Sequence, residues 1–210
     1  MLPLLTTLVA GAFALTVGGQ YVRKRRPYQL FWAIGLALFT VAAASGYLAR
    51  AGGATDLEYR LFYLFGAITN VAWLALGTMY LVAPRFGQVA LALVVLLSAV
   101  AVYAVFAYPV DMAVAVDTGK GYPDGSLPRI LAAVGSGIGS LVLIGGALWS
   151  AWIFLQRRRN GRRALANIVI AVGVLIVAAG GTAAFTGATG ILEVTNLVGI
   201  AVMFVGFLLV

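Results

Sequence analysis

The chain of 210 residues contains neither cysteine nor histidine. Without cysteine it has no disulfides, iron–sulfur clusters, thiolate zinc sites or thiol nucleophiles. Without histidine it lacks the commonest zinc and copper ligand and the usual general base at neutral pH. Its two lysines, Lys24 and Lys120, lie in polar segments, so no amine is placed in mid-membrane for a retinal Schiff base. We therefore expect no cofactor, no metal site and no catalytic residues, and an enzyme is the least favoured class.

Charged residues are scarce as well. They make up 10% of the chain, whereas hydrophobic residues make up 63% and the mean hydropathy is +1.05. A soluble domain is about a quarter charged and roughly half apolar. The composition excludes a soluble enzyme, a disordered protein and a nucleic-acid partner, and the net charge of +8 calls for an explanation in terms of a membrane.

What the sequence has instead is seven apolar runs, each long enough to cross a hydrocarbon core of about 30 Å. In lipid the backbone must satisfy its own hydrogen bonds, so runs of this length are helices and not barrel strands. The predicted fold is an all-α polytopic membrane protein, a single bundle of seven transmembrane helices forming one domain over residues 1–210. The predicted spans are Leu4–Val22, Tyr28–Leu48, Leu61–Val82, Gln88–Tyr108, Ile130–Phe154, Ala164–Phe185 and Ile191–Val210.

The distribution of basic residues predicts the orientation. The first, third and fifth connections hold ten of the fourteen basic residues, and cytoplasmic connections are the ones enriched in lysine and arginine. We expect the N-terminus outside, the C-terminus in the cytoplasm, and a multi-pass protein of a prokaryotic plasma membrane. Basic residues follow the first run and do not precede it, which indicates a retained helix and not a cleaved signal peptide. Contacts with anionic lipid headgroups are predicted for the fifth connection, at Arg157, Arg158, Arg159, Arg162 and Arg163.

Few polar side chains fall inside the runs. Glu193 is the only acidic residue within a span, and such a group is a candidate functional residue. Arg60, at the outer end of the third span, is its predicted partner. In the same span, Tyr63 and Asn70 share one stripe at α-helical spacing, and an amide in mid-membrane needs a hydrogen bond from another helix, a water or a ligand.

These residues predict an outward-facing polar pocket between the third and seventh helices. Its lining would be Tyr63, Asn70, Glu193, Asn196 and Arg60. The pocket requires those two helices to be neighbours; otherwise a structural role is preferred. Two alternatives remain open: Asn70 as a hydrogen bond between helices, and Glu193 as a shallow ion pair that only joins two helices.

Small residues predict close contacts between helices. Gly135 and Gly139 form a G-x-x-x-G spacing, Ser136 and Ser140 repeat it one residue later, and Ala42 and Gly46 share the spacing. No proline lies in the interior of a span, so any interruption of a helix must rest on glycine.

The fourth connection, residues 109–129, is the only long one and is predicted to form an outer cap loop. We expect a short strand over Met112–Val116, with turns at Asp117–Gly119 and Pro123–Gly125.

Three classes of function remain. The leading one is a transporter, channel or ligand-binding bundle for a small molecule or ion. The first alternative is a non-catalytic subunit of a membrane complex or of a homo-oligomer. The second is a seven-helix sensor that signals to a cytoplasmic partner.

Overall fold

The computed structural model describes residues 1–118, 120–156, 161–186 and 190–209. Within these ranges seven helical spans are long and apolar enough to cross a membrane, as the sequence predicts. Five of them are single helices: α1 (Leu2–Lys24), α2 (Pro27–Gly52), α5 (Gly87–Ala107), α9 (Gly161–Thr186) and α10 (Ile191–Leu208). This architecture indicates a membrane protein.

The third and fifth spans each contain a segment of π-helix. The third consists of α3 (Asp56–Phe62), the π-helix η1 (Tyr63–Thr69) and α4 (Asn70–Val82). The fifth consists of α7 (Leu127–Ala132), the π-helix η3 (Ala133–Ile138) and α8 (Gly139–Gln156). Both π segments contain glycine, in line with the expectation that an interruption rests on this residue.

Local signals explain where the helices begin. Proline occupies the first turn of α2 and α7, where its missing N–H would have no partner in any case. The third span begins at Asp56, five residues earlier than predicted, because Thr55 and Glu58 form a reciprocal capping box. Polar capping residues extend this helix beyond its apolar run.

The expected strand over Met112–Val116 is wrong. The segment forms the helix α6 (Met112–Thr118). Asp111, directly before the helix, caps it: the Asp111 side chain accepts a hydrogen bond from the N–H of Val114 at 3.1 Å. A side-chain cap outweighs the β-propensity of the alternating valines. The predicted turn at Pro123–Gly125 is present, with Gly125 in the left-handed region at φ 73°. The other predicted turn includes Gly119, which lies outside the described residues.

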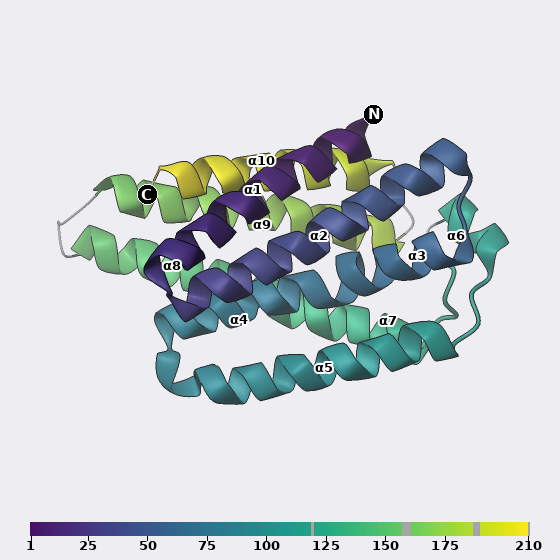
Figure 1. Cartoon of the computed structure of the whole chain (residues 1–210), viewed down its shortest axis with the longest axis horizontal. Coiled ribbons are helices and arrows are strands. Elements are labelled where there is room, and N and C mark those ends of the chain that lie inside the picture. The colour runs from purple at the N-terminus through teal and green to yellow at the C-terminus, as the bar shows by residue number, and fades with distance from the viewer. Residues whose placement is uncertain (119, 157–160, 187–189, 210) are drawn as a thin grey trace.

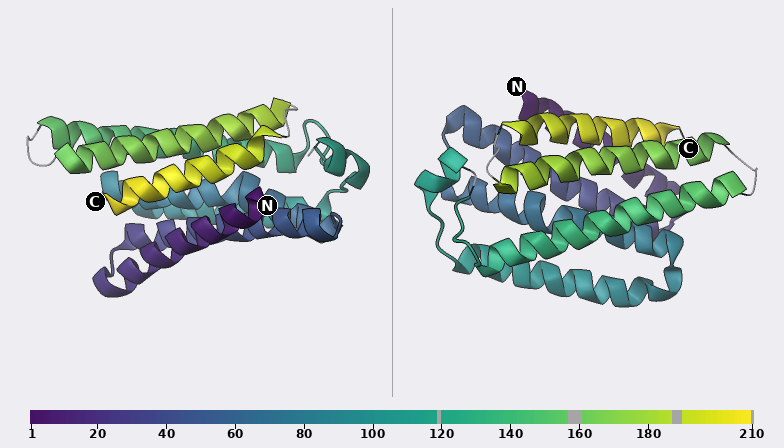
Figure 2. Two further views of the ribbon diagram at one scale, coloured as in Figure 1. Left: turned by 90° about the horizontal axis from the view of Figure 1, so that it is seen from above. Right: turned by 180° about the vertical axis from the view of Figure 1, so that it is seen from behind.

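Six of the seven spans form a closed ring. α1 packs on α2, α2 on α4, α4 on α8, α8 on α9, α9 on α10, and α10 back on α1. In Figures 1 and 2, α1 and α2 lie on one side of the bundle and α8 and α9 on the other, with α4 and α10 between them. One hydrophobic core inside this ring takes residues from all six helices, including Phe13, Leu36, Leu74, Leu143 and Met203.

The seventh span, α5, lies outside the ring. It packs on η1, α4 and α7, and much of its surface is uncovered (Figure 1). A second core joins it to the outer end of the third span and to the cap loop. The sequence gives no direct sign of this difference, since α5 is simply the most hydrophobic of the seven spans.

Close packing between the third and fifth spans occurs at the predicted glycines. A Cβ on Gly135 would lie 2.2 Å from the carbonyl oxygen of Ile68, and one on Gly139 would lie 3.1 Å from that of Val71. A Cβ on Gly66 would lie 3.1 Å from the Cβ of Ala42 in α2. The spacings Gly135/Gly139 and Ala42/Gly46 therefore mark real helix contacts.

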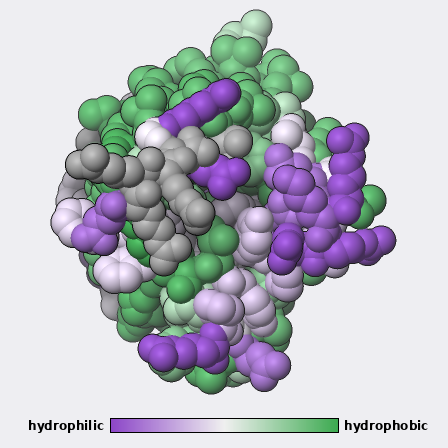
Figure 3. Space-filling view, turned by 90° about the vertical axis from the view of Figure 1, so that its left-hand side faces the viewer, coloured by the Kyte–Doolittle hydropathy of each residue, from purple (hydrophilic) through white to green (hydrophobic). Residues whose placement is uncertain are grey.

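The connections alternate between the two ends of the bundle. The first and third lie at the left-hand end of Figure 1, where α8 ends and α9 begins, and the N-terminus points toward the opposite end. Hydrophilic side chains gather in patches at the left-hand end (Figure 3). Arg162 and Arg163 belong to this end of the bundle, whereas Arg157, Arg158 and Arg159 lie outside the described residues.

Candidate functional site: an apolar cavity inside the six-helix ring

Two adjoining cavities lie inside the ring of helices. The first has a volume of about 30 Å³ and the second about 60 Å³. They are lined in common by Leu36, Leu74, Leu143 and Met203. No charged side chain lines either cavity, and polar side chains are few, so the interior is suited to neutral guests and not to ions.

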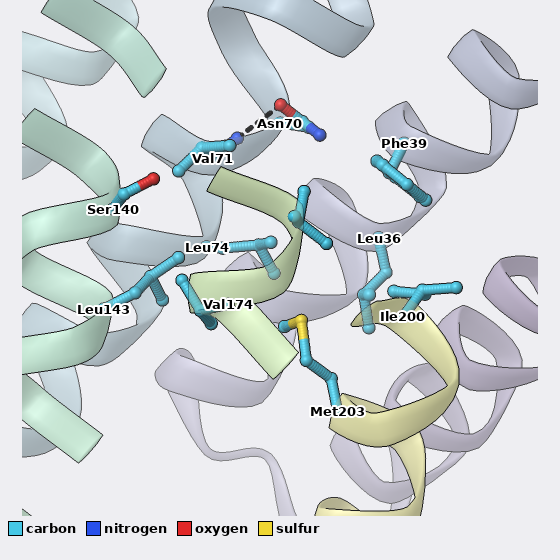
Figure 4. Close-up of a pocket in the computed structure, with 11 residues that line it drawn as sticks. Leu36, Phe39, Asn70, Val71, Leu74, Ser140, Leu143, Val174, Ile200 and Met203 are labelled. Carbon is cyan, nitrogen blue, oxygen red and sulfur yellow. Dashed lines mark hydrogen bonds between the residues drawn. The ribbon is translucent and has the colours of Figure 1, made fainter. Parts of the chain in front are cut away.

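The first cavity is lined by a deeply buried amide. Asn70 is 2% exposed, and its Oδ1 accepts a hydrogen bond from the N–H of Val71 at 2.7 Å (Figure 4). Its Nδ2 has no hydrogen-bond acceptor among the described residues. Since Oδ1 faces an N–H donor, the nitrogen must be the free atom. Among the described residues, the fully buried side-chain atoms without a hydrogen-bond partner are Gln29 Oε1 and Ser126 Oγ, so Nδ2 of Asn70 is not sealed off completely and can donate to a guest that accepts a hydrogen bond.

Ser140 of α8 reaches the same cavity from the other side of Val71 (Figure 4). Its hydroxyl makes no hydrogen bond to any described residue. Among the remaining lining residues, Phe39, Val174 and Ile200 are apolar, and they come from α2, α9 and α10. The cavity wall is thus almost wholly apolar, with Asn70 and Ser140 as its polar lining residues.

The two π segments position these polar groups. The segment η1 ends directly before Asn70, whose N–H donates to the carbonyl of Phe65 five residues back. The segment η3 ends two residues before Ser140 and packs against η1. The Ser136 hydroxyl, in η3, donates to the carbonyl of Ala67 in η1 and links the two irregular turns. Such segments are rare in proteins and are frequent at functional sites.

The second cavity extends toward the end of the bundle that carries the basic connections. Its polar lining includes Thr78, Ser150 and Asn167. The Trp32 indole N–H donates to the carbonyl of Leu74 at 3.1 Å, and the Asn167 amide donates to the carbonyl of Arg163 at 2.9 Å. These donors are satisfied by the protein itself, unlike the amide of Asn70.

The outward-facing pocket between the third and seventh helices stays a prediction. α10 packs mainly on α9 and α1, and α4 of the third span packs mainly on α2 and α8. Of the predicted lining, Asn70 borders the first of the two cavities; Asn196 is partly buried on α10 and lines neither of them.

Tyr63 and Asn70 lie on different faces of the third span because a π segment separates them. A prediction at 3.6 residues per turn places them on one stripe, but one extra residue in a turn rotates the following side chains by about 100°. Tyr63 therefore lies in the second core, beside α5 and the cap loop, and Asn70 lies in the ring.

The predicted pair of Glu193 with Arg60 is wrong. Glu193 pairs with Arg50, near the outer end of α2, where the side chains are 21% and 65% exposed, respectively. The Arg60 Nε lies 2.6 Å from the Asp56 carboxylate, and its Nη1 donates to the carbonyls of Val105 and Tyr108. α2 and the third span both extend beyond their apolar runs. This brings Arg50 within reach of Glu193 and Asp56 within reach of Arg60.

A cluster of three tyrosines anchors the cap loop on the second core. The rings of Tyr59, Tyr63 and Tyr122 have centroids 4.8–5.9 Å apart. The Tyr122 hydroxyl donates to the carbonyl of Val105 at 2.7 Å, and Tyr59 accepts from the N–H of Gly121 at 2.8 Å. Burial raises the pKa of Tyr122 to about 12. This arrangement fixes the loop and does not face the cavity.

In the described ranges, no three acidic side chains come together as a metal site would require. No family model, no curated protein and no solved structure matches the chain.

Proposed function

We propose that the protein is integral to a prokaryotic plasma membrane, with its N-terminus outside and its C-terminus in the cytoplasm. The sequence puts ten of the fourteen basic residues in the first, third and fifth connections, and the described ends of these connections lie at the left-hand end of Figure 1, which supports this orientation. Anionic lipid headgroups are the expected partners of that end, at about 1 kcal/mol for each basic residue near the surface.

Within the membrane, the protein acts as a small-molecule-binding bundle, and the ring of six helices is its binding site. One observation carries this proposal: the Asn70 amide, 2% exposed, borders a cavity lined by helices of the ring, and its Nδ2 makes no hydrogen bond to a described residue. A fixed hydrogen bond between helices would have occupied that donor. An ion transporter or channel has no support here, because neither cavity is lined by a charged residue.

A cavity-filling variant tests the proposal. Ala147 is buried and lines the second cavity, so Ala147→Leu should occupy the space without changing polarity. The melting temperature of the purified protein is measured with xenon, acetone, ethanol, potassium and acetate. We expect a neutral guest to raise the melting temperature of the wild type and not that of the variant. Equal responses of both proteins to every guest would contradict the proposal.

The alternative, a non-catalytic subunit of a membrane complex, is favoured by α5. Val89, Leu93, Leu96 and Tyr103 are exposed along α5 outside the ring. In a complex or a homo-oligomer they would contact a second chain. Disulfide cross-linking of two copies through Leu96→Cys in native membranes, absent for Leu15→Cys on α1, would support a homo-oligomer at this face.

A further inference from the structure

The wall of the second cavity is one side chain thick where α1 and α10 meet. Phe13 of α1 and Phe207 of α10 both line this cavity, one from each side of the seam between the two helices. Phe13 is buried, whereas Phe207 is partly exposed on the outside of the bundle. Because the side chain of Phe207 borders the cavity and also reaches the outer surface, nothing else separates the two at that point.

Aromatic rings close this seam. The ring of Phe13 stacks on that of Phe204, with centroids 4.9 Å apart, and its centroid lies 5.2 Å from that of Phe207. Phe204 is partly exposed and lines neither of the two cavities, so it covers Phe13 on the side away from the second cavity. We call these three residues the phenylalanine gate.

Close backbone contacts hold α1 and α10 to their other neighbours in the ring. A Cβ built on Gly199 or Gly206 of α10 would lie 2.8 or 3.0 Å from a backbone oxygen of α9. On α1, a Cβ on Gly11 or Gly18 would have its nearest neighbours in α2, at 3.6 and 3.9 Å. No glycine among the described residues of α1 and α10 has its nearest neighbours across the seam between them. Bulky side chains, which can change rotamer, close the seam instead.

Surrounding lipid makes such a seam easy to open. Helices in a membrane are not pressed together by a hydrophobic driving force, since lipid chains are as apolar as the side chains. If the ring of Phe204 turns away from Phe13, both rings stay in apolar surroundings. Separating α10 from α9 would instead undo tight contacts between backbones. Of the two seams that α10 makes in the ring, the one with α1 therefore opens more readily.

The second cavity suits an apolar guest. Its lining is mostly aliphatic and aromatic, and its polar lining residues, Thr78, Ser150 and Asn167, lie toward the end that carries the basic connections. An apolar solute concentrates in the hydrocarbon of the bilayer and not in water. The cavity of about 60 Å³ is smaller than the apolar cavity of about 150 Å³ that is known to hold benzene or xenon, so the guest has few heavy atoms.

We propose that the ring takes up small apolar molecules directly from the hydrocarbon core of the membrane, through the phenylalanine gate between α1 and α10. This inference rests on the proposed function, because it assumes that the ring is a binding site. It adds the class of guest, the route by which the guest enters and the three residues that control entry.

Xenon is the probe that tests the gate. Its exchange between the protein and the lipid is measured by saturation-transfer xenon NMR on the full chain in lipid nanodiscs. The signal that Ala147→Leu removes is assigned to the second cavity, which Ala147 lines. Phe204→Ala removes the outer ring of the gate, and Phe204→Trp replaces it with a larger one. Phe62→Ala is the matched control, since Phe62 is a partly buried phenylalanine beside Gly46 of α2 and lines neither cavity.

We expect Phe204→Ala to speed both the entry and the exit of xenon about two- to tenfold, the factor that one lost aromatic contact would give. The bound fraction of xenon should stay the same, because Phe204 does not line the cavity. Phe204→Trp should slow both rates, and it decides the test if Phe204→Ala fails to fold. The control Phe62→Ala should exchange xenon as the wild type does.

The two proposals can fail separately. If the wild type shows no xenon signal that Ala147→Leu removes, the ring is not a binding site and the proposed function fails. If xenon binds but both Phe204 variants exchange it at the rate of the wild type, xenon enters elsewhere, for instance beside Leu81 and Ser150, and the gate is wrong while the proposed function stands. An equal acceleration in Phe62→Ala and Phe204→Ala would also overturn the gate.

Discussion

Gly135→Ala tests the contact between the two π segments. An added Cβ would lie 2.2 Å from the carbonyl oxygen of Ile68 and 3.1 Å from its carbonyl carbon. The helices would have to separate by about 1.2 Å to restore ordinary contact at 3.4 Å. Overpacking costs typically about 1–3 kcal/mol, and we expect about 3 kcal/mol here because both partners are backbone. The separation would also stretch the hydrogen bond from Ser136 to Ala67.

The same π segment offers a matched control. Gly137 has no atom within 4 Å of a Cβ built on it, so Gly137→Ala should be neutral or should stabilise the helix by about 0.5–1 kcal/mol. Unfolding of both variants is followed by circular dichroism during a titration with denaturing detergent. If Gly135→Ala proves as stable as Gly137→Ala, the two segments do not touch as described and the account of how the cavity is positioned is wrong.

Three further predictions concern the ends of the bundle. Tyr122→Phe should destabilise the protein by about 1 kcal/mol, because the hydrogen bond from Tyr122 to α5 is lost. Burial raises the pKa of Tyr122 from 10.0 to about 12, so the stability of the wild type should fall as the pH rises through this window. The melting temperature of the Phe variant should fall less over the same pH range. A double-mutant cycle of Glu193→Gln and Arg50→Gln should give a coupling below about 1 kcal/mol that weakens with salt, since the pair is partly exposed; strict additivity would contradict the pair. A membrane-impermeant thiol reagent should label Asp111→Cys and not Gly161→Cys on intact cells, and the reverse would overturn the orientation.

The spans could be predicted from the sequence because apolar length alone decides them. Seven runs predict seven helices, and the glycines of the fifth span mark a true backbone contact. The ends of the helices were predicted less well, since capping residues such as Thr55 and Glu58 extend a helix into polar sequence. That extension also explains why the partner of Glu193 is Arg50.

The site could be predicted only at Asn70, a lone amide in an apolar helix. Which helices surround it depends on packing between spans of similar hydropathy, which carries no periodic signature. The π segment between Tyr63 and Asn70 is equally hidden, because Gly66 alone does not predict it and its extra residue becomes visible only in the hydrogen bonds. Ser140 stood out through its spacing to Ser136, although its place in a cavity did not.

The account depends most on the free donor of Asn70 inside the ring. An experimental density map of the protein in a lipid nanodisc tests this directly. We expect Asn70 to face the space between α2, α4, α8 and α10, with density for a guest or an ordered water about 3 Å from Nδ2. A map in which Nδ2 instead bonds to a neighbouring helix, with the side chains closed over the cavity, would contradict the central claim.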